Sequence, residues 1–141
     1  MFSNLTFMHA AALTSARAGA PTRRLRILCA EDNPLVGDIL VCLLTRLGHD
    51  VRHARDGREA WSLLSRDLNA FEVVVTDHEM PELGGADLVG LLRQARFAGR
   101  IIVYSSLLND RDRARYEILG VNQIVEKSAV PARLLAAVES A

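Results

Sequence analysis

The sequence has few of the features that would assign it to a specialised class of protein. Among its 141 residues are only two cysteines, and no apolar run approaches the ~18 residues of a transmembrane helix. Lysine and arginine total 17, and aspartate and glutamate also total 17. This balance excludes a strong electrostatic attraction to nucleic acid or to an anionic membrane. We therefore expect proteins or small ions as partners.

The two cysteines, Cys29 and Cys42, are too few for a disulfide framework. Both have apolar neighbours in the sequence, which is typical of buried thiols. We expect both to be buried and reduced, and we expect the protein to be cytoplasmic.

Residues 1–24 differ in composition from the rest of the chain. They contain no aspartate or glutamate, include Arg17, Arg23 and Arg24, and are rich in alanine, serine and threonine. This composition loosely resembles a transit peptide or a weak signal sequence, but the apolar part, residues 10–13, is too short for a secretory core. We expect a flexible extension over 1–24 and a single domain over 25–141.

From Leu25 onward, strand-like and helix-like segments alternate, which is typical of a parallel sheet with crossover helices. The expected strands cover residues 25–30, 50–54, 73–76, 101–104 and 123–126. The expected helices begin at Pro34, after a capping box formed by Asp56 and Glu59, and at residues 86, 109 and 131. The third of these helices is expected to run to residue 98.

Helical spacing also predicts which side chains face the core. In the first helix, Leu35, Ile39, Cys42 and Leu43 recur at intervals of three and four, which predicts an inward stripe. The helix over 109–119 is heavily charged, and such a face is usually solvated.

Polar side chains follow four of the predicted strands. They are Glu31 and Asp32, then Asp77, then Ser105 with Ser106, and finally Lys127. Because the carboxyl ends of parallel strands share one edge of a sheet, these side chains should lie close together.

Carboxylates at such an edge need a cation. Two of them ~4 Å apart repel by about 4 kcal/mol at an effective dielectric of about 20. Lys127 can supply one positive charge, and Mg²⁺ suits the remaining oxygen ligands. Zinc is disfavoured because the cysteines and histidines, among them His49, His53 and His78, lack the required spacing.

Four motifs together resemble a response-regulator receiver domain over residues 25–141. They are Glu31-Asp32, Asp77-His78-Glu79-Met80-Pro81 with Gly84-Gly85, Ser105-Ser106, and Lys127. These motifs follow the first, third, fourth and fifth expected strands, in that order. The resemblance implies an α/β, flavodoxin-like, doubly wound parallel sheet of five strands in the order 2-1-3-4-5, with five helices.

The resemblance also implies roles for individual residues. Asp77 matches the phosphoacceptor, which takes a phosphoryl group from a histidine and becomes an acyl phosphate. Lys127 and the Ser105 hydroxyl match the groups that bind phosphoryl oxygens. Transfer through a loose transition state needs mainly positioning and neutralisation of charge, which these residues and a metal ion would provide.

The implied cofactor is Mg²⁺. Asp32 matches its direct ligand, Glu31 the ligand that acts through water, and the backbone carbonyl of Glu79 a further ligand beside Asp77. The Glu79 side chain, two residues past the phosphoacceptor, would also influence the access of hydrolytic water.

The implied protein is a stand-alone receiver, not an enzyme acting on other substrates, because it would catalyse only its own phosphorylation and dephosphorylation. Its expected partners are a sensor histidine kinase or histidine phosphotransfer protein and a downstream protein target, with neither nucleic acid nor membrane involved. Leu35 and Val36, beside the acidic pocket, could contact the histidine-bearing partner or simply pack. The helix over 109–119 and the strand over 123–126 are the expected surface for a target or a homodimer.

Two positions depart from the family pattern. Where some members carry an aromatic switch residue on the fifth strand, this chain has Ile124, which lacks the polar group of tyrosine. Where the family usually has proline after the lysine, this chain has Ser128, for which a cis bond would cost ~3 kcal/mol.

Other classes of protein therefore stay open. One is a receiver-like adaptor that binds partners without being phosphorylated. Another is a phosphatase that uses Asp77 as nucleophile, although Glu79 is a poor match for the second aspartate of such enzymes. A nucleotide-binding domain is weaker still, because no glycine-rich loop follows the first strand.

Overall fold

The computed structural model describes residues 23–127 and 131–140. The strands are β1 (Arg26–Ala30), β2 (Asp50–Ala54), β3 (Val73–Thr76), β4 (Arg100–Ser105) and β5 (Gln123–Glu126). The helices are α2 (Pro34–Arg46), α3 (Gly57–Arg66), α4 (Gly85–Gln94), α5 (Asp110–Ile118) and α6 (Pro131–Glu139), with a short 3₁₀ helix, η1 (Leu68–Ala70). All strand pairs are parallel, and the order is β2-β1-β3-β4-β5. The predicted fold is confirmed.

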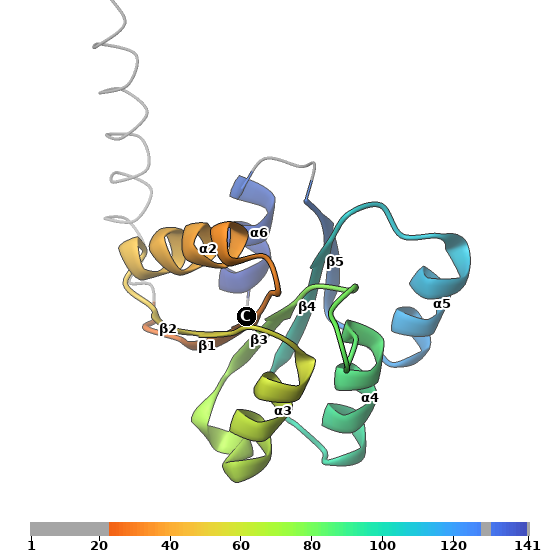
Figure 1. Ribbon diagram of the computed structural model, residues 1–141. Helices are drawn as coiled ribbons and strands as arrows, with labels where there is room; N and C mark the ends of the chain where they lie inside the picture. Colours follow the sequence, from red (N-terminus) through yellow and green to blue (C-terminus); the bar gives the residue numbers. More distant parts are fainter. Residues whose placement is uncertain (1–22, 128–130, 141) are drawn as a thin grey trace, which may run out of the picture.

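Helices cover both faces of the sheet (Figure 1). The helices α2 and α6 lie on one face, and α3, α4 and α5 lie on the other. Successive side chains of a strand point to opposite faces, so Ile27 and Cys29 of β1 belong to the first core and Leu28 to the second. The central strand β3 is buried along its whole length, which explains its continuous run of β-branched residues.

The first two helices begin as predicted, at Pro34 and after Asp56. The Asn33 side chain accepts hydrogen bonds from the backbone N–H groups of Leu35 and Val36, which caps α2. Asp56 caps α3 by accepting from the Glu59 N–H at 2.8 Å. The Glu59 carboxylate accepts from the backbone N–H of Arg55 at 3.0 Å, whereas the capping box predicts the N–H of the next residue, Asp56.

The predicted inward stripe of α2 is wrong. Leu35 is 69% exposed, Ile39 is 48% exposed, and Cys42 is also exposed, so the expectation of two buried thiols holds only for Cys29. The buried stripe contains Leu40 and Leu44, together with Gly37. Both stripes repeat at helical intervals because α2 is apolar over most of its surface, so the spacing alone does not select the buried one.

The helix α4 ends at Gln94, earlier than the predicted residue 98. Arg96 adopts a left-handed backbone conformation with φ of 61°, which stops the helix. The chain then turns so that Phe97, only 3% exposed, enters the core. Gly99 follows where a Cβ would come within 2.5 Å of the Glu72 carbonyl oxygen.

Two residues that were expected to belong to the extension form ion pairs with the domain. Arg23 pairs with Glu72, and Arg24 pairs with Asp50 at 2.5 Å. Residues 1–22 and Ser128 lie outside the described residues. Within the described part of the chain, every helix is too short or too polar to span a bilayer.

Candidate functional site

The first part of the site is the carboxyl end of β1. Glu31 is only 2% exposed, its backbone N–H donates to the Ala54 carbonyl at 3.0 Å, and its Oε2 accepts from the Asn33 N–H at 3.2 Å. The His53 Nε2, at 2.7 Å, donates to the Glu31 carbonyl oxygen. Gly37 leaves the space for this imidazole, because a Cβ there would lie 2.2 Å from its Cε1 atom. Both backbone hydrogen bonds of Glu31 therefore go to β2, and α2 leaves the space that one of them needs.

Asp77 directly follows β3 and is 8% exposed. Its backbone N–H continues the ladder to the Ala30 carbonyl at 2.9 Å, and its Oδ1 accepts from the His78 N–H at 2.7 Å. The first turn of α4 packs against its backbone, since a Cβ on Gly85 would lie 2.1 Å from the Asp77 carbonyl oxygen. Only glycine fits at position 85 in this arrangement.

Lys127 directly follows β5 and joins two of the carboxylates. Its Nζ lies 2.6 Å from Glu31 Oε1 and 3.0 Å from Asp77 Oδ2, and its backbone N–H donates to the Ser105 carbonyl at 2.8 Å. Burial alone would lower the pKa of Lys127, but its bonds to Glu31 and Asp77 outweigh burial and raise that pKa. Lys127 is therefore held charged between them.

The carboxylates remain in excess. Glu31, Asp32 and Asp77 each place one oxygen within 4.8 Å of the others, while Lys127 supplies a single positive charge. Burial raises the pKa of Glu31 even though Lys127 and the Asn33 N–H favour its ionised form, and the nearby Asp77 adds to the increase. An oxygen-only cluster that needs a further cation fits the ligand preference of Mg²⁺.

The other predicted residues lie around this cluster. Ser105 is the last residue of β4 and is 5% exposed, so it ends at the same edge of the sheet as Asp77 and Lys127. Glu79 lies in the loop between β3 and α4, and its side chain is exposed. Ile124, at the position of the aromatic switch residue, packs in the core on the side of α3, α4 and α5, and Tyr104 packs in the opposite core beneath α6.

Sequence reasoning missed a second polar cluster beside Asp77. His78 Nδ1 lies 2.6 Å from the hydroxyl of Tyr116, and His78 Nε2 lies 3.1 Å from Asp112 Oδ2. Tyr116 is fully buried, although it belongs to a helix that is otherwise mostly charged. A single aromatic residue in such a helix was the signal available in the sequence.

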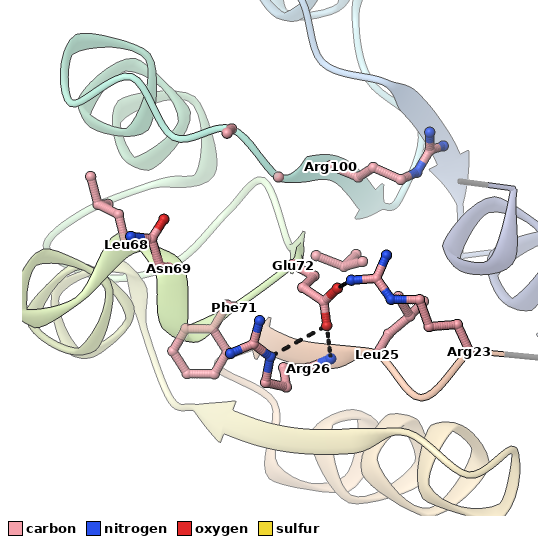
Figure 2. A pocket seen from close by; sticks show the side chains of 11 residues that line it. Arg23, Leu25, Arg26, Leu68, Asn69, Phe71, Glu72 and Arg100 are labelled. Atoms are coloured by element: carbon pink, nitrogen blue, oxygen red, sulfur yellow. Dashed lines mark hydrogen bonds and ion pairs between the residues drawn. The ribbon is translucent and has the colours of Figure 1, made fainter.

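The opposite edge of the sheet carries a hollow of about 390 Å³. Figure 2 shows the Glu72 carboxylate between the guanidinium groups of Arg23 and Arg26. Its Oε1 also accepts from the Arg26 backbone N–H at 3.2 Å. Arg100 points away towards α6, where Nη2 donates to the Ala137 carbonyl at 3.2 Å. The carboxylate here is matched by positive charge.

Residues 27–139 match the response regulator receiver domain. The chain belongs to this family, whose members act in two-component signalling.

Similar proteins come from several bacteria. The gliding motility regulatory protein of Myxococcus xanthus is 32% identical over 116 residues, covering 81% of this chain and 15% of that protein. The chemotaxis protein CheY homolog of Campylobacter jejuni is 40% identical over 70 residues, covering 49% of this chain and 53% of that protein. The chain thus spans a small part of the first relative and about half of the second.

Solved structures agree with the fold. A response regulator receiver protein from Pseudomonas putida has a TM-score of 0.77 at 27% identity, covering 84% of this chain and 98% of that chain. A domain of an uncharacterized Wolinella succinogenes protein has a TM-score of 0.75 at 28% identity, covering 82% and 91%.

Proposed function

We propose that the protein accepts a phosphoryl group on Asp77 from a phosphohistidine of a kinase or phosphotransfer protein. The observation that carries this proposal is the position of Asp77 within one cluster with Glu31, Asp32 and Lys127. We also propose that the protein is cytoplasmic and passes the signal on by binding a protein target or by phosphorelay. It catalyses only its own phosphorylation and dephosphorylation.

In the proposed step, an Asp77 carboxylate oxygen forms a bond to phosphorus while the bond between phosphorus and the donor imidazole nitrogen breaks. The electron pair of the broken bond stays on the imidazole. Lys127, 3.0 Å from Asp77 Oδ2, would then neutralise charge on a phosphoryl oxygen. Ser105, at the end of β4, would donate its hydroxyl to another.

The carboxylate cluster supports a role for Mg²⁺. When bound, this ion supplies positive charge that offsets the phosphoryl oxygens and the carboxylates together. Asp32, which is exposed, would be a direct ligand, and the buried Glu31 would act through water. The Glu79 carbonyl, in the loop after Asp77, would complete the protein ligands.

The phosphodonor is proposed to dock on the first turns of α2. This helix begins at Pro34, two residues after Asp32, and it exposes Leu35 and Ile39 to solvent. A histidine-bearing helix packed on these two side chains would be adjacent to the Asp77 pocket. Exposed apolar side chains next to a reactive carboxylate are the feature that supports this assignment.

The test is incubation of the purified protein with acetyl phosphate, with and without Mg²⁺, followed by intact mass. We expect a gain of one phosphoryl group that requires Mg²⁺ and is lost in Asp77→Asn. Asp87→Asn, which changes an exposed carboxylate on α4, is the matched control and should still be phosphorylated. A folded wild-type protein that gains no mass would instead favour an adaptor that works without phosphorylation.

A further inference from the structure

His78 occupies a position that links the phosphoacceptor to α5. Its backbone N–H donates to Asp77 Oδ1 at 2.7 Å, and its carbonyl accepts from the Gly85 N–H at 2.8 Å. The backbone around His78 is therefore fixed both to the reactive carboxylate and to the start of α4. A change at the Asp77 carboxylate therefore acts on the hydrogen bond of this residue as well as on the ion pair with Lys127.

The side chain of His78 binds two residues one turn apart on α5. The Tyr116 hydroxyl lies 2.6 Å from Nδ1, and Asp112 Oδ2 lies 3.1 Å from Nε2. A carboxylate only accepts, so Nε2 carries the hydrogen that goes to Asp112. With that hydrogen on Nε2, Nδ1 is the acceptor nitrogen and the Tyr116 hydroxyl donates to it, and burial raises the pKa of Tyr116, which favours the protonated hydroxyl. All three groups then have consistent donor and acceptor roles.

The geometry of Tyr116 makes this link specific. Tyr116 is the one buried residue of α5, and its ring meets the imidazole edge to face at a centroid distance of 5.4 Å. Its hydroxyl would be 2.8 Å from a Cβ at Gly85, so it reaches the turn where α4 starts. Ile124 of β5 packs in the same core but has no polar atom to offer. The polar connection between this core and the phosphoacceptor loop runs through Tyr116.

We infer that the hydrogen bonds from His78 to Tyr116 and Asp112 couple the state of Asp77 to the position of α5. This inference rests on the proposed phosphorylation of Asp77. Phosphorylation of one carboxylate oxygen turns Asp77 into an acyl phosphate and changes the acceptor available to the His78 N–H, which displaces the imidazole and both of its bonds to α5. His78, Tyr116 and Asp112 are thus positioning residues that act on the helix and not on the phosphoryl group.

The inference is tested by amide hydrogen exchange over residues 110–118, measured with and without acetyl phosphate and Mg²⁺, while intact mass reports phosphorylation. In the wild-type protein, phosphorylation should change exchange in α5. Tyr116→Phe removes only the hydroxyl, and it should reduce that change by about fivefold, the typical effect of one hydrogen bond. The mass gain at Asp77 should persist in this variant.

Two further variants separate coupling from a general loss of packing. Tyr104→Phe removes the hydroxyl of the other buried tyrosine, in the opposite core, and should behave like the wild-type protein. Asp112→Asn, at a side chain that is 33% exposed, should weaken the coupling even if Tyr116→Phe proves unstable. An α5 response in Tyr116→Phe and Asp112→Asn equal to that of the wild-type protein, or its absence in phosphorylated wild-type protein, would overturn the inference.

Failure of the proposed function gives a different result. If acetyl phosphate adds no mass to the wild-type protein, phosphorylation is ruled out, and the link is then judged from the response to Mg²⁺ alone. Exchange in α5 that responds to Mg²⁺ in the wild-type protein and Tyr104→Phe, but not in Tyr116→Phe, still supports the coupling. An equal response in all three proteins, or none, rejects it.

Discussion

The two edges of the sheet handle buried charge in opposite ways. At the carboxyl edge, Glu31, Asp32 and Asp77 share one lysine, and burial raises the pKa of Glu31. At the amino edge, Glu72 alone is bound by two arginines and a backbone N–H.

The difference separates function from stability. A carboxylate that has a full set of cationic partners holds the chain together and has no capacity left for a ligand. A group of carboxylates with too little positive charge is costly in the folded state and is kept where a cation or a phosphoryl group can bind. The same five strands therefore carry a reactive edge and a structural edge.

The largest expected effect is at the carboxyl edge. Glu31→Gln removes one carboxylate of the cluster and should weaken Mg²⁺ binding by roughly 10- to 100-fold, the range for groups that orient a metal through water. Because burial makes the ionised form of Glu31 less favourable in the folded protein than in the unfolded chain, the neutral amide should also raise the free energy of unfolding without Mg²⁺. Titration calorimetry and urea unfolding measure the two effects.

Glu72→Gln, at the amino edge, is the matched control for that variant and should leave Mg²⁺ binding unchanged. If Glu31→Gln lowers the stability of the metal-free protein, the contrast between a strained and a satisfied carboxylate is wrong.

A second pair of variants, Gly85→Ala and Gly99→Ala, places a methyl group too close to the backbone at each edge of the sheet. A Cβ on Gly85 would lie 2.1 Å from the Asp77 carbonyl oxygen, and a Cβ on Gly99 would lie 2.5 Å from the Glu72 carbonyl oxygen. Each alanine substitution should cost about 1–3 kcal/mol of unfolding free energy, as overpacking does. Only Gly85→Ala should also slow phosphorylation by acetyl phosphate, because only position 85 packs against the phosphoacceptor. Equal rates for the two variants would mean that the backbone of Asp77 is not held by α4.

The effect of Glu72→Gln on stability should be smaller. Arg23 and Arg26 are both more than half exposed, and exposed ion pairs contribute little. Loss of the hydrogen bond from the Arg26 N–H adds to the loss of these ion pairs. The total decrease in the free energy of unfolding should be about 1 kcal/mol, which lowers Tm by about 2–4 °C. Phosphorylation should proceed at the wild-type rate. Differential scanning calorimetry gives the Tm, and a shift several times larger would indicate that the amino edge organises the whole domain.

At neutral pH the smallest effect concerns Cys29, which lies on β1 between the two edges. Burial, with a contribution from the Glu31 charge, raises its pKa to about 12, against 9.0 for a free thiol. At pH 8 a thiol reagent should therefore label the exposed Cys42 at once and Cys29 only through unfolding. Mass spectrometry of labelled peptides, with Cys42→Ser as control, follows both; rapid labelling of Cys29 in folded protein would contradict its burial.

The same pKa predicts a pH dependence. Between pH 9 and 12 the unfolded thiol ionises while the folded one keeps its proton, so stability falls with rising pH. The contribution of Cys29 is about 1.4 kcal/mol per pH unit in that window. Urea unfolding of the wild-type protein and of Cys29→Ala at pH 8 and pH 10 isolates this contribution. The difference in unfolding free energy between the two proteins should shrink from pH 8 to pH 10, and an unchanged difference would contradict the prediction.

Much of the fold was predictable because its signals are local. Asn33 and Asp56 cap their helices through residues two or three positions away, and Asp77 ends a strand by its place after four β-branched residues. The carboxylate cluster was predictable for the same reason, since the end of each parallel strand is visible in the sequence and all the ends share one edge.

The missed features depend on how distant elements are oriented. The buried face of α2 was mistaken because Leu35 and Ile39 have the same spacing as Leu40 and Leu44. The contacts of His78 with Asp112 and Tyr116 span 34 and 38 residues, and they depend on the rotation of α5 about its axis. No pattern within one helix or strand contains that information.

The close approach of Gly37 and His53 should constrain which residues can occupy these two positions in related proteins. The imidazole that supports Glu31 from β2 occupies the volume where a Cβ at position 37 would stand. A side chain at either position therefore restricts the other, so the two sites should vary together among relatives. Lineages that gain a larger residue at 37 should have lost the histidine at 53, and with it this support for the acidic edge.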